Sequence, residues 1–248
     1  MKKFRADLHV HTVLSPCADV EMIPPLIVRA ALEKSIDLIA ITDHNASANV
    51  GAVQQAAAGT GLTVLPGMEV QSKEDVHLLT LFETLDGLNI WQTEVDKALP
   101  NLPNQSAFFG EQFVVDETGE YIRTEERLLS TATQLSIDEI FERVDTLGGI
   151  VIPAHVERTS YGLFPTLGLI SEKWHVLALE ISRYVTPERA TRMFPALGKL
   201  PLIQSGDVHQ LDGFLGTTIF TLASPSLMEI RMALKGIDKR EVCIETRS

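Results

Sequence analysis

Two histidines near the N-terminus have a spacing that suits metal ligation. His9 and His11 are separated by one residue at the end of a short strand-like run. Side chains two residues apart in an extended strand project to the same side, so both imidazoles can face one ion. The alternative for an isolated pair is an ordinary polar strand end. Ligation becomes the better interpretation because similar residues recur along the chain.

Further histidines and acids follow other apolar runs. Five of them stand at or just beyond the carboxyl end of a run: His44, Glu69, His155, Asp207 and His209. In an α/β barrel those ends converge on one face, where loops from different strands build the active site. His77 departs from the pattern because it stands near the beginning of its run. We therefore expect residues that are distant in sequence to form one polar cluster.

Divalent cations explain how such a cluster can be buried. An unpaired buried charge costs several kcal/mol, whereas a divalent cation offsets carboxylates and binds neutral imidazoles. One ion takes about four to six ligands, so the candidates predict two or three ions, with Glu69 bridging a pair. Imidazole and carboxylate together suit Zn, Mn and Fe alike. Two-metal centres clamp phosphoryl oxygens and lower the pKa of a bound water from about 15.7 toward 7, which predicts phosphoester hydrolysis by a metal-bound hydroxide.

Two more candidate ligands lie in the loop 12–19, which contains a Ser-Pro pair. Cys17 can supply a thiolate, or it can be a small buried thiol. Asp19 can reach the cluster, or it can form a turn or cap a helix. Both interpretations are open for each residue.

Three residues are candidates for catalysis without ligation. Arg158 and Arg183 follow predicted strands, where a guanidinium can hold a phosphate through two hydrogen bonds. A structural ion pair is an equal alternative for Arg158. Asp43 precedes His44 and can orient it, act as a general acid, or hydrogen-bond its own loop. No role in the site is predicted for His175, Trp91, Trp174 and Tyr161.

The elements that position these residues alternate between apolar strands and helical segments. Strand, helix, strand alternation predicts right-handed crossovers and a parallel sheet. The segment 83–135 interrupts it with a helix, a turn and a hairpin, and we expect an insertion that covers part of a single domain of residues 1–248. The predicted strands are 4–12, 36–44, 62–69, 76–82, 149–155, 176–183, 201–209, 216–222 and 241–245, and the main predicted helices are 24–32, 48–58, 86–99, 136–147 and 225–235.

Composition narrows the function classes. Of the 248 residues, 45% are hydrophobic and 22% are charged, which indicates a packed core. The formal net charge of −12 favours a small phosphorylated substrate and predicts no extended duplex nucleic acid as a partner. Two cysteines near opposite ends, and no apolar run of about 20 residues, predict a cytoplasmic protein without a membrane span. The sequence predicts no oligomeric state.

Five motifs together resemble a known superfamily. They are Asp7-Leu8-His9-Val10-His11-Thr12, Ile41-Thr42-Asp43-His44, Pro66-Gly67-Met68-Glu69, Ile152-Pro153-Ala154-His155 and Ser205-Gly206-Asp207-Val208-His209. In this order they resemble the successive motifs of the PHP (polymerase and histidinol phosphatase) superfamily.

The resemblance implies an α/β fold, a distorted TIM-like (β/α)7 barrel, with a trinuclear metal site at its carboxyl-end face. It implies three ligand sets: His9, His11, Glu69 and Asp207; Glu69, His77 and His155; and His44 with His209. One departure is that family members carry another His or Asp ligand soon after the His-x-His pair. Here Pro16-Cys17-Ala18-Asp19 occupies that place.

The leading hypothesis is a metal-dependent phosphoesterase that acts on a small phosphorylated substrate, such as a nucleotide or an oligonucleotide end. One alternative is a histidinol-phosphate-type phosphomonoesterase. Another is a non-catalytic metal-binding regulatory module. The intact set of Asp, His and Glu candidates favours an enzyme, because a binding module has no need of groups that activate water.

Overall fold

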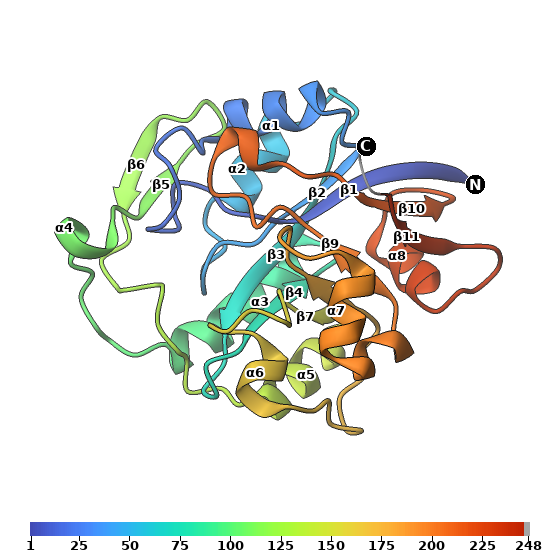
Figure 1. Ribbon diagram of the computed structural model, residues 1–248. Coiled ribbons are helices and arrows are strands. Elements are labelled where there is room, and N and C mark those ends of the chain that lie inside the picture. The colour runs from blue at the N-terminus through green and yellow to red at the C-terminus, as the bar shows by residue number, and fades with distance from the viewer. Residues whose placement is uncertain (246–248) are drawn as a thin grey trace.

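The computed structural model describes residues 1–245 and has at its centre a sheet that curls into a distorted TIM-like barrel (Figure 1). Five barrel strands are adjacent in the main sheet: β1 (Lys2–Val10), β2 (Leu38–Ile41), β3 (Thr63–Gln71), β4 (His77–Leu81) and β7 (Ile150–Pro153). A parallel pair, β8 (Leu179–Ile181) and β9 (Leu202–Gln204), continues the curve. The α/β barrel expected from the sequence is confirmed.

Backbone contacts beyond the strands close the curve. The Val156 amide donates to the Glu180 carbonyl at 2.9 Å, which joins the end of β7 to β8. A parallel bridge pairs Val10 with Val208, which joins the segment after β9 to the end of β1. The carboxyl ends of β1 and β9 therefore lie side by side.

Strand direction departs from the expected parallel sheet. Strands β1, β2 and β3 are parallel, but β4 is antiparallel to both β3 and β7. The reason is the short connection 72–76, since a parallel crossover needs a dozen or more residues. The reversal explains the position of His77, because the start of β4 lies at the same rim as the ends of its neighbours.

Two further strands extend the sheet on the other side of β1. Strand β10 (Thr218–Leu222) pairs antiparallel with the first half of β1, and β11 (Glu241–Ile244) pairs with β10. Helix α8 (Leu227–Leu234) lies between them in sequence and buries Leu227 and Ile230. These elements leave the second half of β1 free to pair with the segment after β9.

Helices cover the outer face of the barrel (Figure 1). Along β2, Ile39 and Ile41 pack in one core cluster with residues of α1 and α2, while Leu38 and Ala40 belong to a second cluster with other strand residues. This period of two is expected of a strand covered on both faces. The helices are α1 (Pro24–Glu33), α2 (Val50–Ala56), α3 (Leu85–Ala98), α5 (Ile137–Thr146), α6 (Leu163–Leu167) and α7 (Pro187–Met193), with 3-10 turns η1 (Pro195–Lys199) and η2 (Leu211–Gly213).

Local signals explain where several helices begin. Proline starts α1, where its missing N–H removes no hydrogen bond. Ser136 and Glu139 form a reciprocal capping box at α5. Among the described residues no helix combines the length and apolar character needed to cross a bilayer.

The segment 83–135 contains α3, the short helix α4 (Ser106–Phe109) and a hairpin of β5 (Phe113–Val115) and β6 (Tyr121–Thr124). It packs on the loop that follows β1, because the Phe113 amide donates to the Val13 carbonyl at 2.9 Å. Asn49 also donates to the Phe113 carbonyl at 3.0 Å. The division into one domain with an insertion stays a prediction.

Candidate metal centre

Backbone pairing brings the first and last motifs together. The His11 amide donates to the Val208 carbonyl, and the Val208 amide donates to the His9 carbonyl, both at 2.9 Å. This double contact fixes the segment 207–209 beside the His-x-His pair. A parallel bridge between His44 and Glu69 does the same for the ends of β2 and β3.

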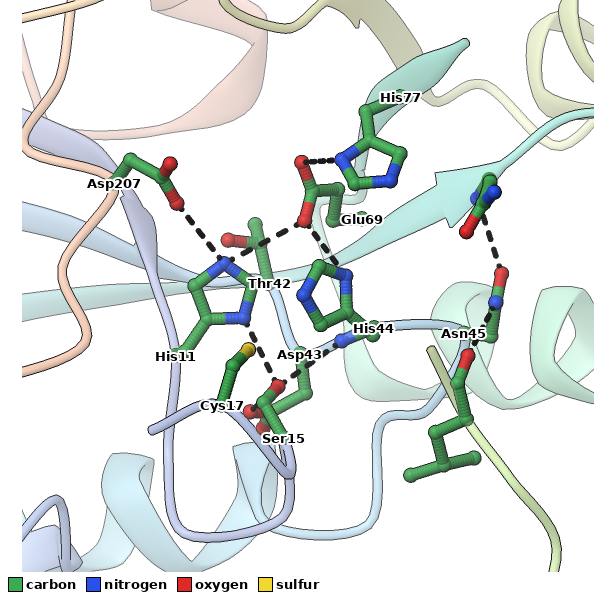
Figure 2. Close-up of polar contacts among 12 residues, drawn as sticks. His11, Ser15, Cys17, Thr42, Asp43, His44, Asn45, Glu69, His77 and Asp207 are labelled. Atoms are coloured by element: carbon green, nitrogen blue, oxygen red, sulfur yellow. Dashed lines mark hydrogen bonds and ion pairs between the residues drawn. The ribbon is translucent and has the colours of Figure 1, made fainter. Parts of the chain in front are cut away.

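Glu69 lies at the centre of the cluster with 1% of its surface exposed. Five imidazoles surround its two oxygens, and Figure 2 shows three of them (His11, His44 and His77) together with Asp207. The distances to a Glu69 oxygen are 2.9 Å from His44 Nδ1, 2.9 Å from His77 Nδ1, 3.2 Å from His9 Nε2, 3.2 Å from His155 Nε2 and 3.5 Å from His11 Nε2. A carboxylate in this position can bridge two cations.

Asp207 supplies the second carboxylate. Its Oδ1 lies 3.4 Å from Nε2 of both His9 and His11, and 3.4 Å from Nδ1 of His209. Its Oδ2 accepts a hydrogen bond of 2.8 Å from Arg158. Asp207 therefore connects the buried histidines with the guanidinium of Arg158 at the rim of the site.

The donor set fits divalent cations. His9 Nε2, His11 Nε2 and Glu69 Oε2 are buried and lie close to other members of the cluster, yet none of them forms a hydrogen bond of good geometry among the described residues. Three groups of residues each bring their ligand atoms within 4.8 Å of one another. They are His9, His11 and Glu69; His44, Glu69 and His77; and His11, His44 and His209. Buried polar atoms without partners are costly, and a cation between them removes that cost.

The charge environment of His77, His11 and Glu69 agrees with this fit. Burial lowers the pKa of His77 to about 4, and it lowers the pKa of His11 well below its usual value. Burial acts against ionisation of Glu69, but the neighbouring histidines hold its pKa well below the usual range. Neutral imidazole and ionised carboxylate are the forms that bind metal ions.

Cys17 lies at the cluster, whereas Asp19 lies away from it. Cys17 Sγ lies 3.1 Å from His209 Nε2, and Cys17 lines the same cavity as Glu69. Cys17 is exposed and is therefore not the small buried thiol of the alternative interpretation. Partial desolvation opposes the thiolate, yet His44 and the contact with His209 lower the pKa of Cys17 to about 6. The Asp19 carboxylate instead accepts from the Glu21 amide within its own turn. The geometry favours Cys17 over Asp19 as an additional ligand.

Asp43 is buried among hydroxyl groups and not against the cavity. Its oxygens accept from the Thr12 amide at 2.7 Å, from Thr12 Oγ1 at 2.8 Å and from Ser15 Oγ at 2.7 Å. Ser15 Oγ in turn lies 2.9 Å from His11 Nδ1 (Figure 2). These contacts favour an orienting role for Asp43 over that of a general acid, but the ring that Asp43 reaches through Ser15 is that of His11 and not that of His44.

The two arginines border two adjoining cavities, of which Arg158 borders both and Arg183 only the second. Arg158 lines a cavity of about 280 Å³ together with Glu69, His77 and His155. Arg183 lines the adjoining cavity, and its guanidinium donates to the Gly213 carbonyl at 2.9 Å. Both therefore lie near the cluster without contributing to its centre.

Two residues were missed by sequence reasoning. Glu180, with 1% exposure, places its oxygens 3.1 and 3.2 Å from His9 Nδ1. Its signal is a lone acid within the apolar run 177–181. Tyr161, for which no site role was predicted, stacks on His77 with ring centroids 4.3 Å apart and lines the cavity. The other three residues assigned no role lie away from this cavity, with Trp91 fully buried in the core.

The backbone is strained at this rim. His155 has φ +29°, Asp207 has φ +49° and Tyr161 has φ +61°. Such conformations cost about 1–3 kcal/mol each in residues other than glycine, and they concentrate where surrounding structure must hold a functional group.

Comparisons with known proteins find a relative for part of the sequence and similar structures for the fold. The 5'-3' exoribonuclease Rnm of Salmonella typhimurium (strain LT2) is 33% identical over 86 residues, which are 34% of this chain and 27% of that protein. The lesion-specific endonuclease PfuEndoQ of Pyrococcus furiosus matches in fold with a TM-score of 0.72 and 20% identity. That match covers 97% of this chain and 58% of the endonuclease, so the chain spans only part of each of these proteins.

The expectation of no extended duplex nucleic acid is wrong. An endonuclease Q structure that holds a 27-mer duplex with an abasic lesion at its active site matches 97% of this chain and 58% of its own, with a TM-score of 0.73 and 19% identity. The expectation came from the net charge of −12. A sum over the whole chain does not describe the field at one cavity, where Arg158 stands at the rim and bound cations would offset the acids.

A family model gives the assignment. The PHP domain model matches residues 7–143, which is more than half of the chain and includes the motifs around His9, His44 and Glu69. The match agrees with the resemblance seen in the sequence and with the barrel fold. The chain therefore belongs to the PHP domain family, whose proteins are hydrolytic, metal-dependent enzymes.

Proposed function

We propose that the chain is a divalent-metal-dependent phosphodiesterase that cleaves nucleic acid. The observation that carries this proposal is Glu69, a buried carboxylate within 2.9–3.5 Å of five imidazoles. It lies on a cavity that also has Arg158 on its wall. A structural metal site has no need of an open cavity and a guanidinium, whereas a phosphoester substrate needs both.

The chain's own residues suggest how cations would be held. His9, His11, Glu69 and Asp207 form one group of donors, and Glu69 forms a second group with His44 and His77. His155 also reaches Glu69 and can complete the second group. Zn, Mn or Fe bound there would neutralise phosphoryl oxygens and lower the pKa of a coordinated water toward 7.

One of the remaining residues can bind the substrate, and the others hold the histidines in place. Arg158 holds its charge at the cavity rim, where it can donate to a non-bridging phosphoryl oxygen while it keeps its bond to Asp207. Glu180 and the Asp43–Ser15 pair fix the rings of His9 and His11 from behind. Tyr161 covers one face of His77 and limits the access of water to that ring.

The comparisons support nucleic acid as the substrate class. The relative that is 33% identical over 86 residues is an exoribonuclease, and both endonuclease Q structures match 97% of this chain in fold. The chain covers only 58% of the endonucleases, so their preference for a lesion does not carry over to it. Whether the chain prefers an end, an internal site or a lesion is a question for the substrate panel.

The experiment is a substrate panel with protein purified without chelator and supplied with Mn²⁺ or Zn²⁺. Labelled single-stranded RNA and DNA, a duplex with an abasic site, and histidinol phosphate are offered separately. We expect cleavage of at least one nucleic acid, with loss of activity in EDTA. Turnover of histidinol phosphate alone would indicate the phosphomonoesterase, and no turnover by metal-loaded protein would indicate the regulatory module.

A pair of variants makes the panel specific to the site. Glu69→Gln removes the central charge but keeps the side-chain shape, and Glu33→Gln makes the same change at an exposed position on α1. We expect cleavage to fall by at least about 100-fold in Glu69→Gln, because charge stabilisation at a metal centre contributes several kcal/mol. Glu33→Gln should cleave as the unchanged protein does.

A further inference from the structure

A second cavity adjoins the metal cavity and shares its wall. It has a volume of about 340 Å³, and Cys17, Arg158, Asp207 and His209 border both cavities. Its outer side is formed by the loop 182–184 and by residues 210–213. Any substrate whose phosphate lies at the metal cluster therefore has a neighbouring space for the group attached to that phosphate.

The loop on the outer side is held by buried polar groups. Both Glu157 oxygens accept from the Ser182 amide, at 3.1 and 3.2 Å. Gln204 Nε2 donates to the carbonyls of Ser182 and Val185, each at 2.9 Å. Glu157 and Gln204 are 9% and 7% exposed, so the contacts exclude most water. The loop is fixed from both sides.

This fixed loop presents two side chains of complementary chemistry. Tyr184 is 79% exposed, and Arg183 is oriented by its bond to the Gly213 carbonyl. Buried polar support for an exposed aromatic ring is typical of binding loops, where rigid aromatic side chains lose little entropy on contact. The acid Asp212 borders the same cavity, so the wall is not a general anion trap. It offers the guanidinium of Arg183, which forms no ion pair with an acid among residues 1–245, beside the ring of Tyr184.

We propose that Arg183 and Tyr184 form a subsite for the unpaired nucleotide next to the scissile phosphate. Tyr184 stacks on the base, and Arg183 binds the phosphate of that nucleotide. An aromatic ring beside a cation is the combination that binds single-stranded nucleic acid without reading its sequence. The inference rests on the proposed function, and it names the form of the substrate at the site.

The subsite has a consequence for duplex substrates. A base inside a duplex is stacked on both faces, so it must leave the stack before Tyr184 can contact it. Ends, single strands and nucleotides beside a lesion meet this condition at the lowest cost. We therefore expect a preference for these substrates over an intact duplex.

The test measures stacking directly. A single-stranded pentanucleotide with phosphorothioate linkages, which slow cleavage, carries 2-aminopurine at each position in turn and is titrated with the metal-loaded protein. We expect fluorescence quenching at one position. Tyr184→Leu should remove the quenching and weaken the Kd by about tenfold, the loss of one stacked base. Tyr184→Phe should retain both.

Two control variants match these changes. Tyr121→Leu replaces another exposed tyrosine, on β6, which Figure 1 shows on the opposite side of the view from α7. Arg29→Met removes an exposed charge from α1. Arg183→Met should make the slope of log K against log salt shallower by about 0.7, the value for one phosphate contact on a single strand. Arg29→Met should leave the slope unchanged.

The outcomes separate the subsite from the proposed function. If the unchanged protein cleaves nucleic acid but Tyr184→Leu quenches and binds as Tyr121→Leu does, the subsite is overturned and the phosphodiesterase stands. If the unchanged protein neither binds nor cleaves any oligonucleotide, both are overturned. Thermal unfolding of each variant shows that a loss of binding does not come from misfolding.

Discussion

His9 illustrates how a single residue is prepared for a cation. Its Nδ1 faces Glu180, while its Nε2 lies 3.2 Å from Glu69 and 3.4 Å from Asp207. Burial disfavours a charge on His9, but these three carboxylates raise its pKa well above the usual value. The surroundings thus favour a positive charge beside Nε2, which a bound cation would supply in place of a proton on the ring. Glu180 also fixes the ring so that Nε2 faces the cluster.

We predict that Glu180→Gln weakens metal binding without unfolding the protein. Loss of a partner behind a histidine ligand costs about 10–100-fold in metal affinity. The measurement is competition with a chelator of known affinity, which reports on binding independently of activity. The matched control is Glu157→Gln, another buried acid, which contacts the Ser182 amide and no histidine. Equal metal affinities of the two variants would contradict the positioning role.

Sequence reasoning found the centre of the cluster and missed its support. Histidines and acids at the ends of apolar strands could be predicted because the barrel brings those ends together. Glu180 stands out as a lone acid in its strand, but it was missed because a strand that is apolar on both faces does not show which face one acid takes. Tyr161 was missed because its contact with His77 depends on how the loop after β7 folds, which no periodicity records.

At the scale of elements, the direction of β4 was predicted wrongly from the sequence. The strands themselves were found from their apolar runs, but the parallel sheet was wrong at β4. The length of the connection 72–76 was the physical signal, since it permits only an antiparallel return. The closure between β9 and β1 was not predictable in detail, because Val208 pairs with Val10 from outside any regular strand.

Packing between strands leads to a prediction for Gly67 in β3. A Cβ there would lie 2.9 Å from a Leu81 methyl and 3.0 Å from the Ile41 carbonyl. Gly67→Ala should lower the free energy of unfolding by about 1–3 kcal/mol through overpacking. Gly51→Ala, in α2, meets only an ordinary contact of 3.6 Å and should raise it by about 0.5–1 kcal/mol. Urea unfolding measures the free energy of unfolding of both variants. If Gly67→Ala is as stable as Gly51→Ala, the predicted overpacking at Gly67 is refuted.

The link between α8 and β11 predicts a pH dependence. Arg240 donates to both Glu229 oxygens at 2.7 Å and, with the Ala223 amide, lowers the pKa of Glu229 to about 2. A carboxyl group with a lowered pKa stabilises the fold at pH values above its ordinary pKa of 4.5. This stabilisation is lost as the pH falls toward 2. Arg240→Met should therefore lower the Tm most at neutral pH, and the difference should narrow below about 4.5. A constant difference from pH 7 to pH 3 would contradict the ion pair.

At the scale of the whole molecule, metal binding and folding are coupled. The candidate ligands come from β1, β3, β4 and the segments after β2, β7 and β9, so they assemble only when the barrel closes. The unfolded chain offers no such arrangement. A ligand that binds only the folded state adds stability that grows with its concentration.

We predict that divalent ions raise the Tm and that EDTA lowers it. At a free metal concentration of about 100 times Kd, one site adds about 2.7 kcal/mol. For a chain of this length that corresponds to roughly 5–10 °C. Thermal unfolding followed by circular dichroism, with and without EDTA, measures the shift. A Tm that is the same in both conditions would mean that the buried histidines do not depend on cations.

The most direct measurement is the metal content of the protein purified without chelator, compared with that of Glu69→Gln. Elemental analysis should find two or three divalent ions in each unchanged chain and the loss of at least one in the variant, because Glu69 lies between both groups of ligands. Glu33→Gln should retain the full content. An unchanged chain that holds no ion when ions are plentiful, or a Glu69→Gln chain with undiminished content, would contradict a metal centre built around Glu69.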